Sequence, residues 1–266
     1  DRPVPQHPTV RARDQGFLLH EAEHIWRDFA EQLTAEHPYL PPDNIQQFPT
    51  YEVADRTSPT NIGMALLSCL AAWELGLAEE EQVTPLLGHM LDSIQKLPKW
   101  RGHLYNWYHI KTTQPLAPIF ITTVDCGNLC ACLIALSQGL REKGYSELAE
   151  QAQALADAME FRPLYDDQRK LFYIGYDCEQ QDFTPGRYDL MASEARLASY
   201  VAVARGDVPV EHWASLNRSL VGRRQYCGMV SWTGTMFEYF MPQLLLPAPV
   251  GSLLYETLCF AVCAQM

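Results

Sequence analysis

Acidic, aromatic and amide side chains gather in five short segments of this sequence, and that mixture of residue types suits carbohydrate chemistry. Tryptophan and tyrosine offer flat apolar faces, while Asn, Asp, Arg and His offer hydrogen bonds, which together match the C–H face and hydroxyl rim of a sugar ring. Carboxylates beside such a surface can supply the acid and the nucleophile or base of glycoside cleavage. The segments are residues 56–63 (RTSPTNIG), 100–108 (WRGHLYNWY), 123–128 (TVDCGN), 187–196 (RYDLMASEAR) and 231–239 (SWTGTMFEY).

Glu194 is the carboxylate that a structural role explains least. It falls on the second turn of a predicted helix made largely of Ala, Leu, Met and Val, where an inward-pointing carboxylate requires a partner or a function. Arg196 or Arg205 could pair with it in a purely structural ion pair. Glu238 has its own alternative, because Thr235-x-x-Glu238 is the pattern of a capping box at a helix start.

Other polar residues of these segments also have structural alternatives. Asp125 and Asp189 lie at predicted helix starts, where an aspartate commonly caps the helix. Trp107 and Trp232 could be core residues that close the ends of a helical bundle. His103 is the histidine placed inside a dense motif, but no spacing such as His-Glu-x-x-His or a doubled Cys-x2-Cys accompanies it. We therefore expect neither a metal nor a cofactor.

Apolar residues recur at helical spacing through most of the chain, which predicts a helical array. The predicted helices cover residues 17–36, 58–75, 80–97, 125–141, 145–159, 190–205, 209–216, 235–246 and 252–266, with a short hairpin within residues 161–188. The first repeats have a spacing of about 65 residues, which indicates two antiparallel helices per unit. Alternate helices of such an array are parallel. We therefore expect the five segments, which precede these helix starts, to meet at one end.

Composition excludes several classes of partner. The 266 residues are 47% hydrophobic and 20% charged and carry a net charge of −12, which argues against nucleic acid or an anionic membrane as a partner. Eight cysteines are too few for a disulfide scaffold and indicate a reducing compartment, most simply the cytoplasm. The sequence shows no signal peptide and no run of about 20 apolar residues, so we expect no direct membrane contact.

Taken together and in order, the five segments resemble the glycoamylase-like central region of cyclic β-1,2-glucan synthases. The resemblance covers residues 50–260, and it departs from the family's usual pattern at Cys126, where the family has Ser. It implies an all-α fold, an (α/α)6 toroid of helical hairpins that is truncated at the C-terminus, because fewer helices are predicted than a toroid contains. Residues 1–50 would form an extended N-terminal segment and first helix, and residues 51–266 the incomplete domain.

The resemblance also implies an activity. In that family this region cleaves a linear β-1,2-glucan and joins the new end to the chain's own far end, a retaining transglycosylation within an inner-membrane synthase. The implied partners are the glucan and the synthase's glycosyltransferase and phosphorylase-like regions. Glu194 is the first and Glu238 the second candidate for a catalytic carboxyl, although a second carboxylate could lie beyond Met266. The residues implied to bind the glucan are Arg56, Asn61, His103, Tyr105, Trp107, Asp125, Asn128, Asp189 and Trp232.

Two alternatives remain open at this stage. The nearest is plain hydrolysis by an endo-β-1,2-glucanase, which differs only in whether water or a sugar hydroxyl accepts the glycosyl group. The other is a non-catalytic glucan-binding or scaffolding module of the synthase. That module would bind glucan equally well after Glu194→Gln or Glu238→Gln, and neither change would alter any reaction.

Overall fold

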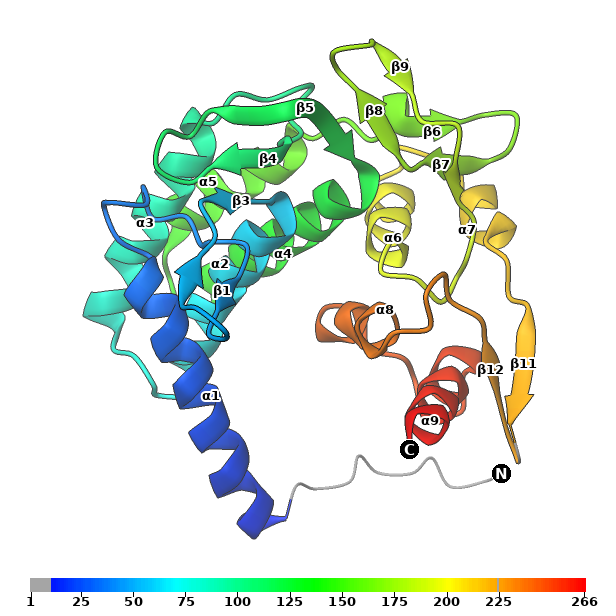
Figure 1. Ribbon diagram of the computed structural model, residues 1–266, viewed down its shortest axis with the longest axis horizontal. Coiled ribbons are helices and arrows are strands. Elements are labelled where there is room, and N and C mark those ends of the chain that lie inside the picture. Colours follow the sequence, from blue (N-terminus) through cyan, green and yellow to red (C-terminus); the bar gives the residue numbers. More distant parts are fainter. Residues whose placement is uncertain (1–10, 224) are drawn as a thin grey trace.

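The computed structural model describes residues 11–223 and 225–266, and it combines helices with small antiparallel sheets (Figure 1). The helices are α1 (Ala12–Gln32), α2 (Pro59–Glu74), α3 (Glu80–Lys96), α4 (Thr123–Glu142), α5 (Ser146–Asp157), α6 (Arg196–Ala204), α7 (Glu211–Ser215), α8 (Met236–Phe240) and α9 (Leu253–Gln265). Short 3-10 helices cover Arg162–Leu164 and Met241–Leu244. The strands are β1 (Ile45–Gln46), β2 (Glu52–Val53), β3 (Arg56–Thr57), β4 (Asn106–His109), β5 (Pro115–Thr122), β6 (Tyr165–Asp166), β7 (Leu171–Tyr173), β8 (Gly175–Asp177), β9 (Asp182–Phe183), β10 (Arg187–Tyr188), β11 (Leu220–Arg223) and β12 (Tyr226–Met229).

The prediction of an all-α fold, an (α/α)6 toroid, is wrong. About 49% of the residues are helical and 17% lie in strands, which form a five-stranded sheet in the order β3-β4-β5-β8-β9, a three-stranded sheet in the order β10-β7-β6, and two strand pairs. The hairpin predicted within residues 161–188 is present, but β4, β5, β11 and β12 occupy segments for which the sequence predicts no strand. Their β-branched and aromatic residues, such as those at 119–121 in β5, favour extended backbone once neighbouring strands are available.

The five-stranded sheet sets two helix N-termini side by side. Strand β3 ends directly before α2, and β5 ends directly before α4. Strand β4 lies between them and pairs antiparallel with both, through Arg56 with His109 on one side and Asn106 with Phe120 on the other. The sheet therefore fixes the distance between the starts of α2 and α4, which carry two of the five segments.

Side-chain caps fix the first residues of these two helices. Ser58 caps α2, with Pro59 at the first helical position, and its Oγ accepts the Asn61 N–H at 3.3 Å. This confirms the predicted start of the helix. Thr122 caps α4, and its Oγ1 accepts the Asp125 N–H at 3.2 Å. The alternative that Asp125 is itself the cap is therefore wrong, and its carboxylate is left for other contacts.

Helix α6 begins six residues later than the sequence predicts, at Arg196 rather than near Leu190. The residues before it are held by backbone hydrogen bonds to Asn217, whose N–H donates to the Asp189 carbonyl at 2.6 Å and whose carbonyl accepts the Met191 N–H at 3.0 Å. The Asp189 carbonyl is therefore not available to accept the first hydrogen bond of a helix that begins near Leu190. Asp189 therefore caps no helix, and Glu194 lies in the turn that enters α6 rather than within it.

Helix α4 lies at the centre of the larger hydrophobic core and packs against α2, α5 and α6. It is long and apolar enough to cross a membrane by length and composition, but most of it is buried inside the protein, which accounts for its apolar residues. A smaller core joins the turn before α6 to β12, α8 and α9. Figure 1 shows α2–α5 on the left, α6 to the right of α4, and α8 and α9 below α6.

The N-terminal helix begins earlier in the chain than the sequence predicts. Residues 1–10 of the predicted extended segment lie outside the described residues, and α1 begins at Ala12, earlier than the predicted Phe17. All eight cysteines, from Cys69 to Cys263, are free thiols.

Candidate active site

The N-termini of α2 and α4 are joined by hydrogen bonds between side chains. The Thr60 hydroxyl donates to Asp125 Oδ1 at 2.6 Å, and the Thr122 hydroxyl donates to Asp125 Oδ2. The Asn128 amide, one turn further along α4, donates to Thr60 Oγ1 at 3.1 Å. Asn128 is completely buried, and its Oδ1 has no partner among the described residues. Two predicted site residues, Asp125 and Asn128, therefore belong to one hydrogen-bond network. The network also includes Thr60 and Thr122, which the sequence analysis did not name as site residues.

Glu194 lies beside this network, in the turn that leads into α6. Its side chain is partly buried. Burial and the charges of Asp125 and Glu238 raise the pKa of Glu194 to about 7, and a hydrogen bond from the Asn128 amide opposes part of that rise. A substantial fraction of Glu194 is therefore protonated at neutral pH, which is the state required of a general acid.

No structural ion pair accounts for Glu194 within residues 11–223 and 225–266. Arg196 is 2% exposed and donates to the Met191 carbonyl at 3.3 Å rather than to a carboxylate. Arg205 pairs with Asp207 at 3.2 Å and donates to the Ala156 carbonyl at 2.8 Å. The alternative that either arginine neutralises Glu194 therefore finds no support, and a functional reason for this carboxyl is favoured.

Glu238 lies in the first turn of α8, where its carboxylate accepts several hydrogen bonds. Its Oε2 accepts hydrogen bonds from the Ser231 hydroxyl at 2.9 Å, the Thr233 N–H at 2.8 Å and the Thr233 hydroxyl at 2.6 Å. Burial acts to raise the pKa of Glu238, but these donors and the Trp232 backbone outweigh it, so the pKa lies below its ordinary value. At neutral pH the carboxyl of Glu238 is therefore ionised, whereas that of Glu194 is about half protonated.

The capping-box alternative for Glu238 is only half met. Thr235 Oγ1 accepts the Glu238 N–H at 3.4 Å, as in a capping box. The Glu238 side chain does not return to the Thr235 N–H but binds the loop that precedes the helix, including the Gly234 N–H at 3.2 Å. The carboxylate thus orders the loop that presents Trp232.

Tyr188 and Trp232 form the aromatic part of this site. Their ring centroids lie 6.3 Å apart in an edge-to-face arrangement, and Trp232 is 49% exposed, so it is not the core residue that the structural alternative proposed. Burial and the charges of Asp125 and Glu194 raise the pKa of Tyr188 well above its ordinary value, so its phenol is neutral. Tyr188 is absent from the predicted site residues, although it stands within one of the five segments. Its position next to the predicted residue Asp189 could have indicated it. The Asp189 backbone carbonyl accepts the Asn217 N–H, and this bond holds the segment in place.

Three predicted residues form a second cluster at the start of α2. The Arg56 guanidinium lies 4.5 Å from the centroid of the Trp107 ring and pairs with Asp43 at 3.1 Å. The Asn61 amide donates to the other oxygen of Asp43, also at 3.1 Å. Asp43, which holds both residues, lies in a proline-rich connection with no local pattern that could have predicted it. Because Asn61 follows Thr60 directly, this cluster borders the Asp125 network.

His103 and Tyr105 are placed differently from the residues above. The His103 ring is fully buried and its Nε2–H donates to the Glu160 carbonyl at 2.9 Å, with its ring edge-to-face on Phe161. It has no exposed surface with which to touch a ligand, so we assign it to packing. Tyr105 is partly buried, and its backbone N–H donates to the Tyr108 hydroxyl at 2.9 Å.

The burial of His103 predicts a loss of stability in acid. Because Nε2–H is already used and Nδ1 is buried without a partner, protonation would place an unpaired charge in the core, and burial lowers the pKa of His103 to about 4. The unfolded chain therefore binds this proton first, and the free energy of unfolding should fall by roughly 3 kcal/mol as the pH drops from 6.5 to 4. Urea unfolding at several pH values tests this, with His103→Gln as the control. An equal slope in both proteins would contradict the assignment.

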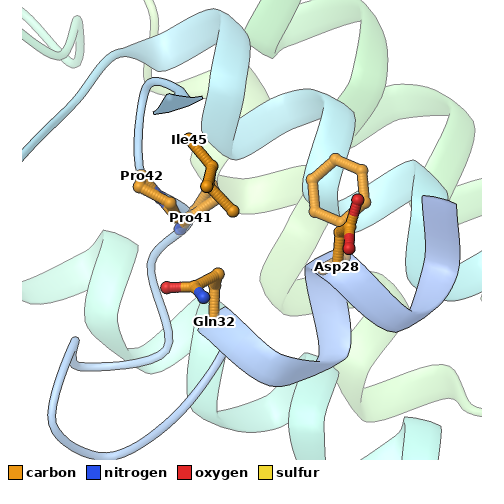
Figure 2. A pocket seen from close by; sticks show the side chains of 6 residues that line it. Asp28, Gln32, Pro41, Pro42 and Ile45 are labelled. Carbon is orange, nitrogen blue, oxygen red and sulfur yellow. The ribbon is translucent and has the colours of Figure 1, made fainter. Parts of the chain in front are cut away.

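One hollow of the surface lies apart from the carboxylates. Figure 2 shows it between the C-terminal half of α1 and the loop that leads to β1. Its lining residues are Asp28, Phe29, Gln32, Pro41, Pro42 and Ile45. The hollow is mainly apolar and contains no predicted site residue. No group of three or more His, Cys, Asp or Glu suited to a metal ion occurs in the part of the chain that the structure describes.

The arrangement as a whole resembles the machinery of glycoside cleavage. One carboxyl, that of Glu194, keeps about half of its protons at neutral pH because it is partly buried near two other carboxyls, and a second, that of Glu238, is held ionised by hydrogen-bond donors. Because one environment raises the pKa of a carboxyl and the other lowers it, the site holds a proton donor and a carboxylate anion at the same pH. The adjacent Tyr188 and Trp232 rings provide an apolar surface beside them.

Comparison with known proteins confirms the resemblance drawn from the five segments. The cyclic β-(1,2)-glucan synthase NdvB of Rhizobium meliloti (strain 1021) is 28% identical over an alignment of 363 positions, which covers 89% of this chain and 13% of the synthase. The alignment is longer than the chain, so the synthase has additional residues within the matched region. No protein-family model matches the chain.

Several solved structures of other proteins have a fold similar to that of this chain. An endo-β-1,2-glucanase from Chitinophaga pinensis, in complex with sophorotriose and glucose, superposes with a TM-score of 0.74 at 14% identity, over 92% of this chain and 65% of the glucanase. A glucoamylase-like protein from Bacteroides uniformis superposes with a TM-score of 0.73 at 12% identity, over 97% of this chain and 66% of that protein. At these identities the likeness establishes a shared fold.

Proposed function

We propose that this chain acts on β-1,2-glucan and that it carries out a retaining transglycosylation that closes a linear glucan into a ring, as part of a cyclic β-1,2-glucan synthase. One observation carries the proposal: Glu194 is partly buried, is about half protonated at neutral pH, has no cationic partner within residues 11–223 and 225–266, and lies near the ionised Glu238 and the Tyr188–Trp232 pair. The similarity to the Rhizobium synthase and to the fold of the Chitinophaga glucanase supports the choice of substrate.

Each carboxyl has a definite role in this reaction. Glu194 donates its proton to the glycosidic oxygen, so that the leaving sugar departs as a neutral alcohol. Glu238 stabilises or attacks the anomeric carbon, either directly or through a substrate hydroxyl or water. The Glu194 carboxylate then takes a proton from the incoming hydroxyl at the far end of the same glucan, and that oxygen forms the new glycosidic bond. Acid and base forms are thereby both restored.

Glucan would bind to two groups of residues: the one around Glu194, Tyr188 and Trp232, and the one at the start of α2. Trp232 and Tyr188 offer an apolar ring face next to the carboxyls, and Trp107 offers another at the start of α2. Arg56 lies over one face of the Trp107 ring, so a sugar that stacks on that face must displace the guanidinium. Asn61 and Asp189 provide polar groups at the margins. In the whole synthase, glycosyltransferase and phosphorylase-like regions would supply and trim this glucan.

Incubation of the chain with linear β-1,2-glucan tests the proposal directly. We expect products that are lighter than the corresponding linear glucans by one water, because ring closure joins the two ends of one chain without adding water. Mass spectrometry after chromatographic separation identifies them. Heat-denatured protein serves as the control for spontaneous breakdown.

The other outcomes separate the remaining alternatives. Shortened linear glucans without rings would show that water is the acceptor and would replace transglycosylation with hydrolysis. Unchanged glucan together with measurable binding in calorimetry would overturn the catalytic proposal and favour a glucan-binding module. Unchanged glucan without binding would overturn the substrate assignment as well.

A further inference from the structure

Two histidines on α1 lie in direct contact on the surface of the protein. Residues 20–24 of this helix (HEAEH) have the His-Glu-x-x-His spacing that is typical of zinc-binding helices. His20 and His24 are one helical turn apart and therefore share one face of α1, and both are exposed. None of the five segments lies on α1, so this pair is separate from the candidate active site.

The separation of the two rings suits a metal ion bound by both. Their Nε2 atoms lie 3.1 Å apart, with the ring planes at 81° to each other. An imidazole nitrogen binds zinc at about 2.0–2.1 Å, so two such bonds at an angle between roughly 90° and the tetrahedral value place the nitrogens about 2.9–3.3 Å apart. The observed distance falls within that range. Because both side chains are exposed, the rings can turn towards an ion without disturbing the core.

Arg27 determines which nitrogen of His24 carries the hydrogen. The Arg27 guanidinium can only donate, and it lies 2.7 Å from His24 Nδ1. His24 Nδ1 must therefore accept, so the hydrogen of the neutral ring is on Nε2 and is donated to His20 Nε2. The lone pair of His20 Nε2 is thus already directed to its neighbour. A change of tautomer at His24 is all that is needed to free the second Nε2 lone pair.

The pair lacks what a hydrolytic zinc centre requires. In such centres a third protein ligand joins the two histidines of the helix. No group of three or more His, Cys, Asp or Glu that could hold a metal ion occurs within residues 11–223 and 225–266. Glu21, which has the position of the general base in this spacing, is exposed. The observations therefore support metal binding by two protein ligands and not metal-dependent hydrolysis.

We propose that His20 and His24 form a binding site for a divalent transition-metal ion such as Zn²⁺, Ni²⁺ or Cu²⁺. Imidazole suits these ions, whereas Mg²⁺ and Ca²⁺ prefer oxygen ligands. Each Nε2 gives one lone pair to the ion, the hydrogen of His24 moves from Nε2 to Nδ1, and water completes the coordination. The ion joins two successive turns of α1, which Figure 1 shows extending away from the other helices, and so stabilises this helix.

Calorimetric titration of the full chain with Zn²⁺ tests the site. We expect the affinity to fall about tenfold or more in His20→Asn and in His24→Asn, since even groups that only support a metal ligand contribute 10- to 100-fold. His37→Asn is the matched control. The His37 Nδ1–H donates to the Gln32 carbonyl at 3.1 Å, and His37 has no histidine partner among the described residues, so its loss should leave the affinity unchanged. Equal Zn²⁺ affinity in all these proteins, or equally strong binding of Mg²⁺, would overturn the proposal.

Arg27 provides a variant that should bind the metal more tightly. Once His24 Nδ1 carries the hydrogen, the Arg27 guanidinium loses its acceptor, and its positive charge repels the ion. Arg27→Gln removes that charge and should raise the Zn²⁺ affinity about tenfold. The matched control is Arg13→Gln, because Arg13 is also exposed on α1 but pairs with Asp14 at 3.3 Å rather than with a histidine. Equal affinities in these two variants would contradict binding through His24 Nε2.

NMR of the histidine ring nitrogens gives a readout on the unaltered chain. In protein labelled with ¹⁵N at histidine, Zn²⁺ should shift the Nε2 signals of His20 and His24 and convert His24 to the tautomer with hydrogen on Nδ1. Amide hydrogen exchange along α1 should slow when Zn²⁺ is added, because the ion opposes local opening of the helix. Shifts confined to other histidines would overturn the proposal. Neither measurement involves glucan, so failure of the proposed function would leave this test intact.

Discussion

Glu194→Gln is expected to reduce turnover of β-1,2-glucan by about a thousandfold, within the range of roughly 10² to 10⁴ that general acid catalysis contributes. Glutamine has the size of glutamate and can still accept a hydrogen bond from Asn128, but it has no proton to give to the leaving sugar. Binding of the glucan should therefore change little while the chemical step is lost. Rates at saturating glucan and binding calorimetry on the same samples measure the two effects separately.

The leaving group provides a sharper test of the same variant. An aryl glycoside whose phenol is a good leaving group needs little protonation, so Glu194→Gln should lose far less activity on it than on the glucan. The matched control is Glu150→Gln, because Glu150 is an exposed glutamate of α5 that belongs to none of the five segments. Equal losses on both substrates would indicate that Glu194 acts in binding or folding, and full activity on the glucan would exclude it from the reaction.

The parts of the site that the sequence predicts are those governed by local rules. Ser58 followed by Pro59 marks the start of α2, and the helical spacing of apolar residues marks α4. Parallel alternate helices then imply that their N-termini meet, and Thr60 on α2 is indeed hydrogen-bonded to Asp125 on α4. These inferences need only capping and periodicity, both of which are encoded within a few residues.

The parts that the sequence does not predict depend on contacts between distant residues. The backbone bridge between Met191 and Asn217 delays the start of α6 and so moves Glu194 out of the helix. Strand β5 forms because β4 and β8 lie on either side of it, although its own residues are also compatible with a loop. Asp43, in turn, becomes a site residue only through Arg56 and Asn61. Pairing of this kind has no signature in a local window.

Gly127→Ala is expected to be strongly destabilising, because α4 and α6 touch at this glycine. A Cβ added there would lie 2.5 Å from the Ala198 Cα and 2.8 Å from the Ala198 N. These are backbone atoms that no side-chain rotation can move away. Overpacking of a core typically costs about 1–3 kcal/mol and occasionally more, and we expect the upper part of that range or beyond. Urea unfolding followed by circular dichroism measures the change.

Gly88→Ala is the matched control within helix α3. The nearest atom to an added Cβ is Leu148 Cδ2 at 3.7 Å, an ordinary contact, and alanine favours a helix interior over glycine by about 0.5–1 kcal/mol. This variant should be as stable as the unaltered chain or more so. A Gly127→Ala protein of the same stability as Gly88→Ala would show that the contact between α4 and α6 can open without cost.

The same substitution links packing to the chemistry of the site. Gly127 stands between Asp125 and Asn128 on α4, and Ala198 lies four residues after Glu194, so their close contact sets how near the two carboxyls can come. If Gly127→Ala still folds, α4 and α6 must move apart. The pKa of Glu194, followed by NMR titration of protein labelled with ¹³C at the glutamate carboxyl, should then fall, because burial and the charge of Asp125 both raise it. A misplacement of about 1 Å can also cost a hundredfold in rate. A folded Gly127→Ala protein with an unchanged Glu194 pKa would mean that the environment of Glu194 does not depend on this contact.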